Sequence, residues 1–351
     1  MSSSASWTPE QAWQWHRGRP YRVGFNYLPR NAVNQLEMWQ EATWSPDVIG
    51  EELDWAARIG FNSLRVFLHD RAWQSDPVGF LDRMEAFLRI ADERGFRTLW
   101  VFFDSCWHPQ PRPGPQRPPE PFVHNSGWLQ SPGRAVLESG AFHELEPYVR
   151  AVLDRFGRDP RVEGWDLWNE PSNVGVGNYA PRDLGDRKPA LVAEALALTL
   201  GWVRACRPDQ PLTCGLWQRD LTGESPADLI ELQLAASDVV SFHSYLPAEP
   251  TGALVERLRA HGRPLLCTEY MARSAGSTFE SILPLLLNSG VGAYHWGLVA
   301  GRSQTIYPWD SWQVRYESEP EPWFHDLLRP DGSPYRETEV DFIRELLRAH
   351  R

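Results

Sequence analysis

One pattern recurs eight times along this chain: a short apolar run typical of a β-strand, separated from the next by a segment with helical spacing of apolar residues. The strand-like runs are 21–27, 61–68, 96–103, 162–168, 211–217, 239–245, 264–270 and 292–296. Helical runs are found at 45–60, 80–95, 145–157, 191–206, 226–237, 253–262, 279–290 and 339–350. Alternating strands and helices imply parallel pairing, and eight such units predict an α/β chain folded as a (β/α)8 TIM barrel.

The main competing architecture is a doubly wound parallel sheet. That fold would need a glycine-rich phosphate loop after the first strand, and "GFNYLPRN" at 24–31 is not one. A chain of 351 residues suits a single barrel domain, here 1–351, with 1–20 as an N-terminal extension. The barrel is therefore the favoured prediction.

Two connections are too long to be simple turns. Residues 104–142 follow the third strand and 297–335 follow the eighth, and both segments are rich in proline and aromatic residues. In a barrel they would emerge at the C-terminal ends of the strands, where active sites are built, and long ordered loops in such places usually serve function. We expect both to be active-site loops.

Charge and composition limit the classes of partner that this chain is expected to bind. The formal net charge of -11 argues against nucleic acids and anionic membrane surfaces. No stretch reaches the apolar length expected of a membrane span, and the N-terminus lacks a secretory signal pattern. We expect a cytoplasmic protein unless a leader segment precedes this sequence. Its 4 cysteines show no C-x-x-C spacing, so a zinc ribbon is not expected.

Polar and aromatic residues stand where the predicted strands end. In a barrel these positions converge on one mouth. In chain order they are Asn26, Arg65, Asp104, Asn169, Glu170, Trp217, His243, Tyr245, Glu269 and Trp296.

Two members of that set, Glu170 and Glu269, each terminate an otherwise apolar strand. Cleavage of a glycosidic bond uses paired carboxyls, one protonated to donate to the leaving oxygen and one ionised. Arg65, His243 and Tyr245 are neighbours of the kind that would keep one carboxylate ionised. A single glutamate would more simply form an ion pair at the rim, but two at these positions favour a glycosidase.

The motifs at these strand ends resemble those of the clan A glycoside hydrolases, and glycoside hydrolase family 5 most closely. "WNEP" at 168–171 is similar to the acid/base motif, and "CTEY" at 267–270 to the nucleophile strand. The resemblance implies that Glu170 is the acid/base, that Asn169 binds the sugar 2-hydroxyl, and that Glu269 is the nucleophile. It also implies hydrolysis of β-linked sugars with retention, the carboxyls being about 5 to 5.5 Å apart.

Further motifs extend the resemblance across the barrel. "FNSLRV" resembles the motif whose arginine, here Arg65, supports the nucleophile, and "FHSY" the pair His243 and Tyr245 that lines the site. Trp296 matches the aromatic residue beneath the sugar next to the scissile bond. The third strand departs from the family: "VFFDSCWH" presents Asp104 and Cys106 where a histidine is common, and His108 comes only later.

Additional sugar-binding residues are predicted from the 18 tryptophans, since flat aromatic faces pack against sugar rings. Core packing is the alternative for each of them. The candidate platforms are Trp39, Trp107, Trp217 and Trp309, and the candidate hydroxyl binders are Gln304 and Asp310. The two long loops would wall off one end of a groove, which favours a pocket acting on oligosaccharides or chain ends.

Other functions remain open at this stage. A metal-dependent hydrolase could draw on His69, Asp70, Asp104, His108 and His243. Such barrels usually begin with closely spaced histidines on the first strand, and "GFNYLP" has none, so we predict neither metal nor cofactor. A non-catalytic sugar-binding barrel would be expected to lose one of the two glutamates. A transglycosylase would use the same residues and is not separable from a hydrolase here.

Overall fold

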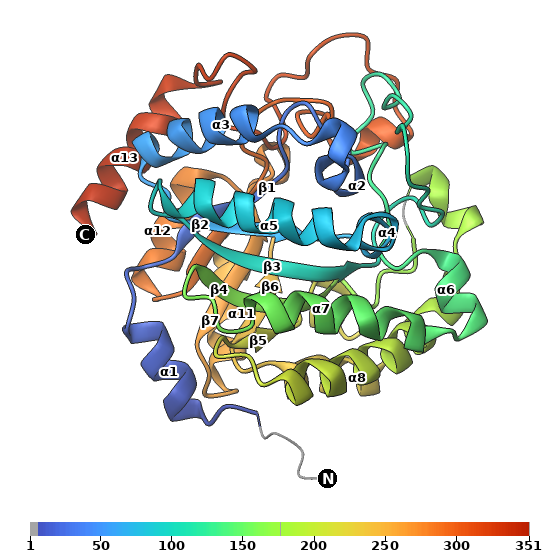
Figure 1. Ribbon diagram of the computed structural model, residues 1–351. Helices are drawn as coiled ribbons and strands as arrows, with labels where there is room; N and C mark the ends of the chain where they lie inside the picture. The colour runs from blue at the N-terminus through green and yellow to red at the C-terminus, as the bar shows by residue number, and fades with distance from the viewer. Residues whose placement is uncertain (1–5, 176, 351) are drawn as a thin grey trace.

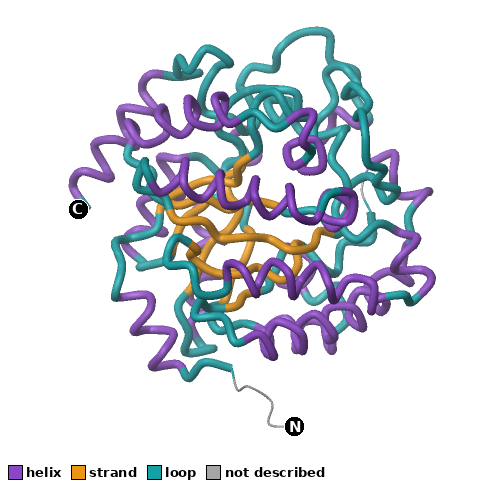
Figure 2. The backbone as a smooth tube through the Cα atoms, viewed as in Figure 1, coloured by secondary structure: helices purple, strands orange, loops and turns teal. Residues whose placement is uncertain are grey.

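The computed structural model describes residues 6–175 and 177–350. Eight strands lie at its centre and helices surround them (Figures 1 and 2). The strands are β1 (Val23–Tyr27), β2 (Ser63–Phe67), β3 (Arg97–Asp104), β4 (Val162–Asn169), β5 (Leu212–Thr213), β6 (Val240–His243), β7 (Leu265–Tyr270) and β8 (Gly292–Trp296).

Longer helices follow most strands, and shorter ones lie in the loops. The α-helices are α1 (Pro9–Arg17), α2 (Gln35–Trp39), α3 (Pro46–Ile59), α4 (Asp70–Ser75), α5 (Pro77–Asp92), α6 (Arg134–Ser139), α7 (Glu146–Phe156), α8 (Lys188–Cys206), α9 (Gln218–Thr222), α10 (Ala227–Ala236), α11 (Ala248–Arg259), α12 (Phe279–Asn288) and α13 (Glu337–Ala349). The 3₁₀ helices are η1 (Glu41–Thr43), η2 (Phe142–Leu145), η3 (Gly177–Arg182), η4 (Gly185–Arg187), η5 (Arg273–Ala275) and η6 (Trp309–Trp312).

The strands pair in parallel in the order β5-β4-β3-β2-β1-β8-β7-β6. The two ends of this series meet through an isolated parallel bridge between Leu216 and Phe242. There the Leu216 amide donates to the Ser241 carbonyl at 2.9 Å and the His243 amide donates to the Leu216 carbonyl at 2.8 Å. The sheet is therefore a nearly closed (β/α)8 barrel, which confirms the predicted fold class.

The fifth strand is shorter than predicted. The run 211–217 is buried almost throughout, but only Leu212–Thr213 pairs with β4. Beyond it the Cys214 amide donates to the Ser237 side chain at 3.1 Å instead of joining a ladder. A buried apolar run gives the same sequence signal whether or not its backbone pairs, so the sequence could not reveal this difference.

Helix α3 shows how the sequence positions the helical shell. Pro46 occupies its first turn, and Gly60 ends it in the left-handed region at φ 116°. Ile49, Leu53 and Ala56 are fully buried on its inner face. Packing of such apolar stripes against the outer faces of the strands holds the barrel together.

The N-terminal extension contains α1, which begins with a capping box at Thr8. Ala12 of α1 packs in one buried cluster with Leu99 near the start of β3, Val239 directly before β6 and Leu266 near the start of β7. Helix α1 therefore covers the end of the barrel opposite the predicted mouth.

One helical stretch, Gly185–Cys206, is long and apolar enough to cross a membrane by length and composition, contrary to the expectation from the sequence. Within the fold, Val192, Leu196 and Val203 of this stretch are fully buried in the main hydrophobic core. Packing on the barrel accounts for part of the apolar composition of α8, since 39% of the 18-residue apolar window in this stretch is buried and Leu198 keeps 44% of its surface exposed.

Candidate active site

The C-terminal ends of the strands open into a cavity of about 1100 Å³. One end is enclosed by the two long loops, which we call the β3 loop (104–142) and the β8 loop (297–335). They are tied together: the Phe122 amide donates to the Gln304 side chain at 2.8 Å, and Trp107 stacks on Trp312 with ring centroids 5.2 Å apart. Helices α9 and α11 border the other end, where Pro250 faces solvent.

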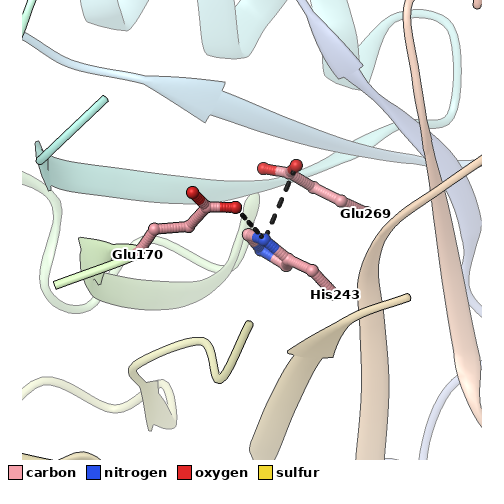
Figure 3. A group of neighbouring side chains, drawn as sticks. All are labelled: Glu170, His243 and Glu269. Atoms are coloured by element: carbon pink, nitrogen blue, oxygen red, sulfur yellow. Dashed lines mark hydrogen bonds and ion pairs between the residues drawn. The ribbon is translucent and has the colours of Figure 1, made fainter. Parts of the chain in front are cut away.

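Two carboxylates and an imidazole meet on the floor of this cavity. Glu170 directly follows β4, Glu269 lies in β7, and His243 ends β6. The His243 Nδ1 atom lies 2.9 Å from Glu170 Oε1 and 3.5 Å from Glu269 Oε2. One polar atom from each of the three side chains lies within 4.8 Å of the others. Figure 3 shows the three side chains converging from different strands. The two predicted glutamates are therefore neighbours.

Glu269 is held by a cation and a hydroxyl. Arg65 Nη1 donates to its Oε1 atom at 2.9 Å, and the Tyr245 hydroxyl donates to its Oε2 atom at 2.8 Å. Arg65 is fully buried, and its Nε and Nη2 atoms both donate to Asp166 Oδ2, at 3.1 and 2.9 Å. This fork geometry fixes the guanidinium beside Glu269.

Glu170 is held by neutral donors. Asn173 Nδ2 donates to its Oε2 atom at 2.9 Å, and the Cys106 thiol donates to the same oxygen at 3.1 Å. In the described part of the chain, no arginine or lysine forms an ion pair with Glu170. Its backbone lies in the left-handed region at φ 47°, a conformation that costs a non-glycine residue about 1 to 3 kcal/mol. The turn at Pro171 therefore sets the direction of this side chain at some energetic cost.

Burial shifts the ionisation of all three central groups. It raises the pKa of both glutamates, because a carboxylate loses its hydration in the cavity. At Glu269 that rise in pKa is opposed by the charge of His243 when protonated and by the charge of Arg65. At Glu170 it is opposed first by hydrogen bonds from Asn173 and Cys106, and to a smaller extent by the charge of Arg65. Burial lowers the pKa of His243 to about 4, so this ring is neutral at pH 7.

Asn169 is positioned between two of the predicted polar residues. Its Oδ1 atom accepts from Arg65 Nη2 at 2.7 Å, and its Nδ2 atom donates to Asp104 Oδ1 at 3.0 Å. The second oxygen of Asp104 accepts from Trp128 Nε1 at 2.5 Å. Both oxygens of Asp104 are thus engaged, and this residue orients the Asn169 amide at the cavity wall. Trp296 also lines the cavity, and its ring packs against Trp128 with ring centroids 5.6 Å apart.

Three predicted substrate contacts are placed elsewhere. Asn26 donates to the Thr268 carbonyl at 2.8 Å and accepts from Arg65, so it supports the guanidinium from outside the main cavity. Gln304 bridges the β3 and β8 loops and donates to the Glu120 carbonyl at 2.7 Å. Trp39 is fully buried in the core. Each of these side chains is occupied by protein contacts instead of facing the cavity.

The other predicted aromatic residues, Trp107, Trp217 and Trp309, do line the cavity, as does Asp310. Trp309 is the most open of them, with 40% of its surface exposed. Trp217 Nε1 donates to the Ser172 hydroxyl, which places this ring beside the segment that carries Glu170. These three rings are available as platforms for a sugar or for its leaving group.

The residues considered for a metal site do not form one. Among the described residues, the group with metal-ligand spacing is Glu170, His243 and Glu269. The Arg65 guanidinium contacts Glu269 directly, so a fixed cation already occupies one side of this group. His69 and Asp70 form a buried pair at 3.2 Å that lies outside the cavity lining.

Several residues that line the cavity were not predicted from the sequence as site residues. Asn173 lies three positions beyond Glu170 in "NEPSN", and this short spacing was an available signal. Trp128, Trp312 and His325 come from the long loops, and no local pattern indicates that they point into the cavity. Their positions depend on how the two loops pack on each other.

Comparison with known proteins gives structural matches only. No family model matches the chain, and no curated protein matches it. The exo-β-1,4-mannosidase Op5Man5 from Opitutaceae bacterium strain TAV5 matches with a TM-score of 0.65 and 19% identity, over 99% of this chain and 62% of that one. This chain therefore spans less than two thirds of that protein.

Two further solved structures give similar results. A GH5_18 variant from Streptomyces cattleya in complex with Manβ1-4GlcNAc has a TM-score of 0.64 and 18% identity, covering 95% of this chain and 81% of that one. The endo-1,4-β-mannanase from Rhizomucor miehei has a TM-score of 0.60 and 14% identity, covering 94% of each. In fold, the chain resembles glycoside hydrolases of family 5. At these identities the likeness extends to the fold alone.

Proposed function

We propose that this protein is a retaining β-glycosidase, with Glu269 as nucleophile and Glu170 as acid/base. The observation that carries the proposal is the pair of buried carboxylates on the cavity floor, within 4.8 Å of one another by one atom each. That spacing suits direct attack by one carboxylate, because inverting enzymes keep their carboxyls about 6.5 to 9.5 Å apart to admit a water molecule.

The different partners of the two glutamates support this division of roles. The Arg65 cation stabilises the ionised form of Glu269, which a nucleophile requires. Burial raises the pKa of both glutamates, but Glu170 has only neutral hydrogen-bond donors against that rise, which suits a group that must carry a proton at the start of the reaction.

The reaction then proceeds in two balanced steps. In the first, a Glu269 oxygen bonds to the anomeric carbon, the bond to the leaving oxygen breaks, and Glu170 gives that oxygen its proton. In the second, the Glu170 carboxylate takes a proton from water, the water oxygen attacks the anomeric carbon, and Glu269 is released. The Tyr245 hydroxyl holds Glu269 in position for attack.

The enclosed end of the cavity favours action at chain ends. Trp107, Trp128 and Trp312 wall it in, so a polysaccharide would have difficulty continuing through. The structural neighbours include an exo-β-1,4-mannosidase and a GH5_18 variant bound to Manβ1-4GlcNAc. A terminal β-mannoside is therefore our first choice of substrate.

The test uses 4-nitrophenyl β-glycosides of mannose, glucose, galactose and xylose, with proton NMR to identify the anomer released first. We expect the mannoside to be cleaved fastest and the β-anomer to appear first. A Glu170→Gln/Glu269→Gln double variant prepared in parallel controls for a contaminating glycosidase. Release of the α-anomer first, or cleavage of none of the four, would contradict the proposal.

A further inference from the structure

We propose that the solvent-facing end of the cavity binds an apolar alcohol as leaving group, such as an alkyl or aryl aglycone, in preference to a second sugar. The inference rests on the proposed function and specifies the other half of its substrate. We call this end the outer arm, and it is formed by Trp217, Leu221, Leu246, Pro250, Ala253 and Leu254.

The outer arm lies on the side of the cavity where the leaving group must go. Trp217 and α9 are attached to the segment after Glu170, because Trp217 Nε1 donates to Ser172 Oγ and Ser172 Oγ donates to Asp220 Oδ1 at 2.5 Å. The acid/base has to reach the leaving oxygen, so the leaving group lies beside Glu170. The opposite end, enclosed by the loops, remains for the glycone.

The two ends of the cavity differ in chemistry. At the enclosed end, the buried Oδ1 atom of Asn125 has no hydrogen-bond partner among the described residues and can accept from a sugar hydroxyl. Asp104 and Asn169 line the same end, and their polar atoms already bond to protein groups. The outer arm is lined instead by four aliphatic side chains, one proline ring and the Trp217 ring. An apolar surface of this kind gains from burying hydrocarbon and gives hydroxyl groups few partners.

Several polar groups around the outer arm already have protein partners. The Thr222 hydroxyl donates to Glu224 Oε1 at 2.8 Å, and Arg257 Nη2 donates to the Leu221 carbonyl at 2.7 Å. Gln218 and Arg257 both stand at the exposed edge of the cavity. The hydroxyls of a sugar ring seated here would lose hydrogen bonds to water, and only Gln218 and Arg257 at the edge could replace some of them. An alkyl or aryl group has no such hydrogen bonds to lose and gains from leaving water.

The experiment compares leaving groups of matched acidity, so that chemistry and binding are separated. The probes are 4-methylphenyl and 4-butylphenyl β-glycosides of the sugar that the four-sugar screen identifies, together with the corresponding β-1,4-linked disaccharide. We expect kcat/KM to be about tenfold higher for the butyl compound, because three added methylenes are partly buried against the arm. We also expect the disaccharide to show a higher KM than the butyl compound.

Two variants locate the effect. Leu221→Asn and Ala253→Asp place polar groups in the outer arm and should reduce the butyl-to-methyl ratio to about one to three. The matched control is Leu198→Asn, which changes an exposed leucine of α8 outside the cavity and should keep the wild-type ratio.

The failures of the two proposals are distinguishable. A butyl-to-methyl ratio near one in an active wild-type enzyme, or a lower KM for the disaccharide than for the butyl compound, would overturn the outer arm alone. A butyl-to-methyl ratio of kcat/KM that stays near ten in both variants would contradict the placement of the aglycone site in the outer arm. An enzyme that cleaves no glycoside at all would overturn the proposed function and this inference together.

Discussion

The glutamates at the ends of β4 and β7 share His243 as a neighbour and differ in their other partners. At β7, Glu269 contacts the buried guanidinium of Arg65 and the hydroxyl of Tyr245. At β4, Glu170 contacts the Asn173 amide and the Cys106 thiol. Under the proposed mechanism, the neighbours of each carboxyl determine its role through the charge state that they stabilise.

The backbone differs between the two sites as well. Glu269 lies within β7, where the pairing register with β6 and β8 shifts, whereas Glu170 sits one residue past the end of β4 at φ 47°. In the proposed mechanism, Arg65 and Tyr245 hold Glu269 for attack on the anomeric carbon, and Glu170 at the turn after β4 would protonate the leaving oxygen.

Removal of Glu269 should have the largest effect. Glu269→Ala deletes the atom that bonds to the anomeric carbon, so kcat should fall by at least about 10⁴-fold with every leaving group. Steady-state rates on aryl β-glycosides measure this loss. Glu280→Ala, at an exposed glutamate of α12, is the matched control and should be unaffected. Substantial activity in Glu269→Ala would refute the nucleophile assignment.

Removal of Glu170 should depend on the leaving group. An acidic phenol departs without help, but a sugar or alkyl alcohol needs a proton, so Glu170→Ala should lose about 10² to 10⁴-fold in kcat/KM with poor leaving groups and far less with good ones. A plot of log kcat/KM against leaving-group pKa measures this, and it should be steeper for the variant than for the wild type. Equal losses across the series would rule out an acid role.

Arg65 should act through the charge state of Glu269. In Arg65→Gln the buried carboxylate loses its cation, the pKa of Glu269 rises, and a higher pH is needed to ionise it, so the acidic limb of the kcat/KM profile should move to higher pH. Activity at pH 7 should fall about 10²-fold. Arg65→Lys keeps the positive charge, so its acidic limb should lie between those of Arg65→Gln and the wild type. Since Arg65 is fully buried, circular dichroism should accompany both profiles.

Substitution of Cys106 should have the smallest effect, and it should shift the basic limb of the pH profile instead of the acidic one. The Cys106 thiol donates to Glu170 and lowers the pKa of that carboxyl, so Cys106→Ala should raise this pKa. Glu170 is active when protonated, and the basic limb of the kcat/KM profile should therefore move to higher pH, with less than about tenfold change at the optimum. Cys106→Ser keeps a donor and should stay closer to the wild type. The partly buried Cys206 provides the control, Cys206→Ala.

The features predictable from the sequence are those set by strand register. Glu170 and Glu269 follow or end apolar strands, and parallel strands in a barrel deliver such positions to one mouth, so their proximity followed from topology. The same argument correctly predicted that Arg65, His243 and Tyr245 lie beside the two glutamates.

Loop residues were not predictable in the same way. Gln304 and Trp39 carry side chains suited to sugars, but Gln304 joins two loops and Trp39 packs in the core. Their directions depend on contacts between segments far apart in the chain, for example the 182-residue separation between Phe122 and Gln304. Cys106 was noted only as a departure from the family motif, and its contact with Glu170 required the path of the β3 loop.

The most direct test of the division of roles between the two glutamates is the stereochemistry of azide rescue. Both alanine variants would be incubated with an activated aryl β-glycoside and sodium azide, and the glycosyl azides analysed by NMR. In Glu269→Ala, azide takes the place of the nucleophile and should give the α-azide. In Glu170→Ala, azide attacks the intermediate on Glu269 and should give the β-azide. The reverse assignment of anomers, or the same anomer from both variants, would contradict the account.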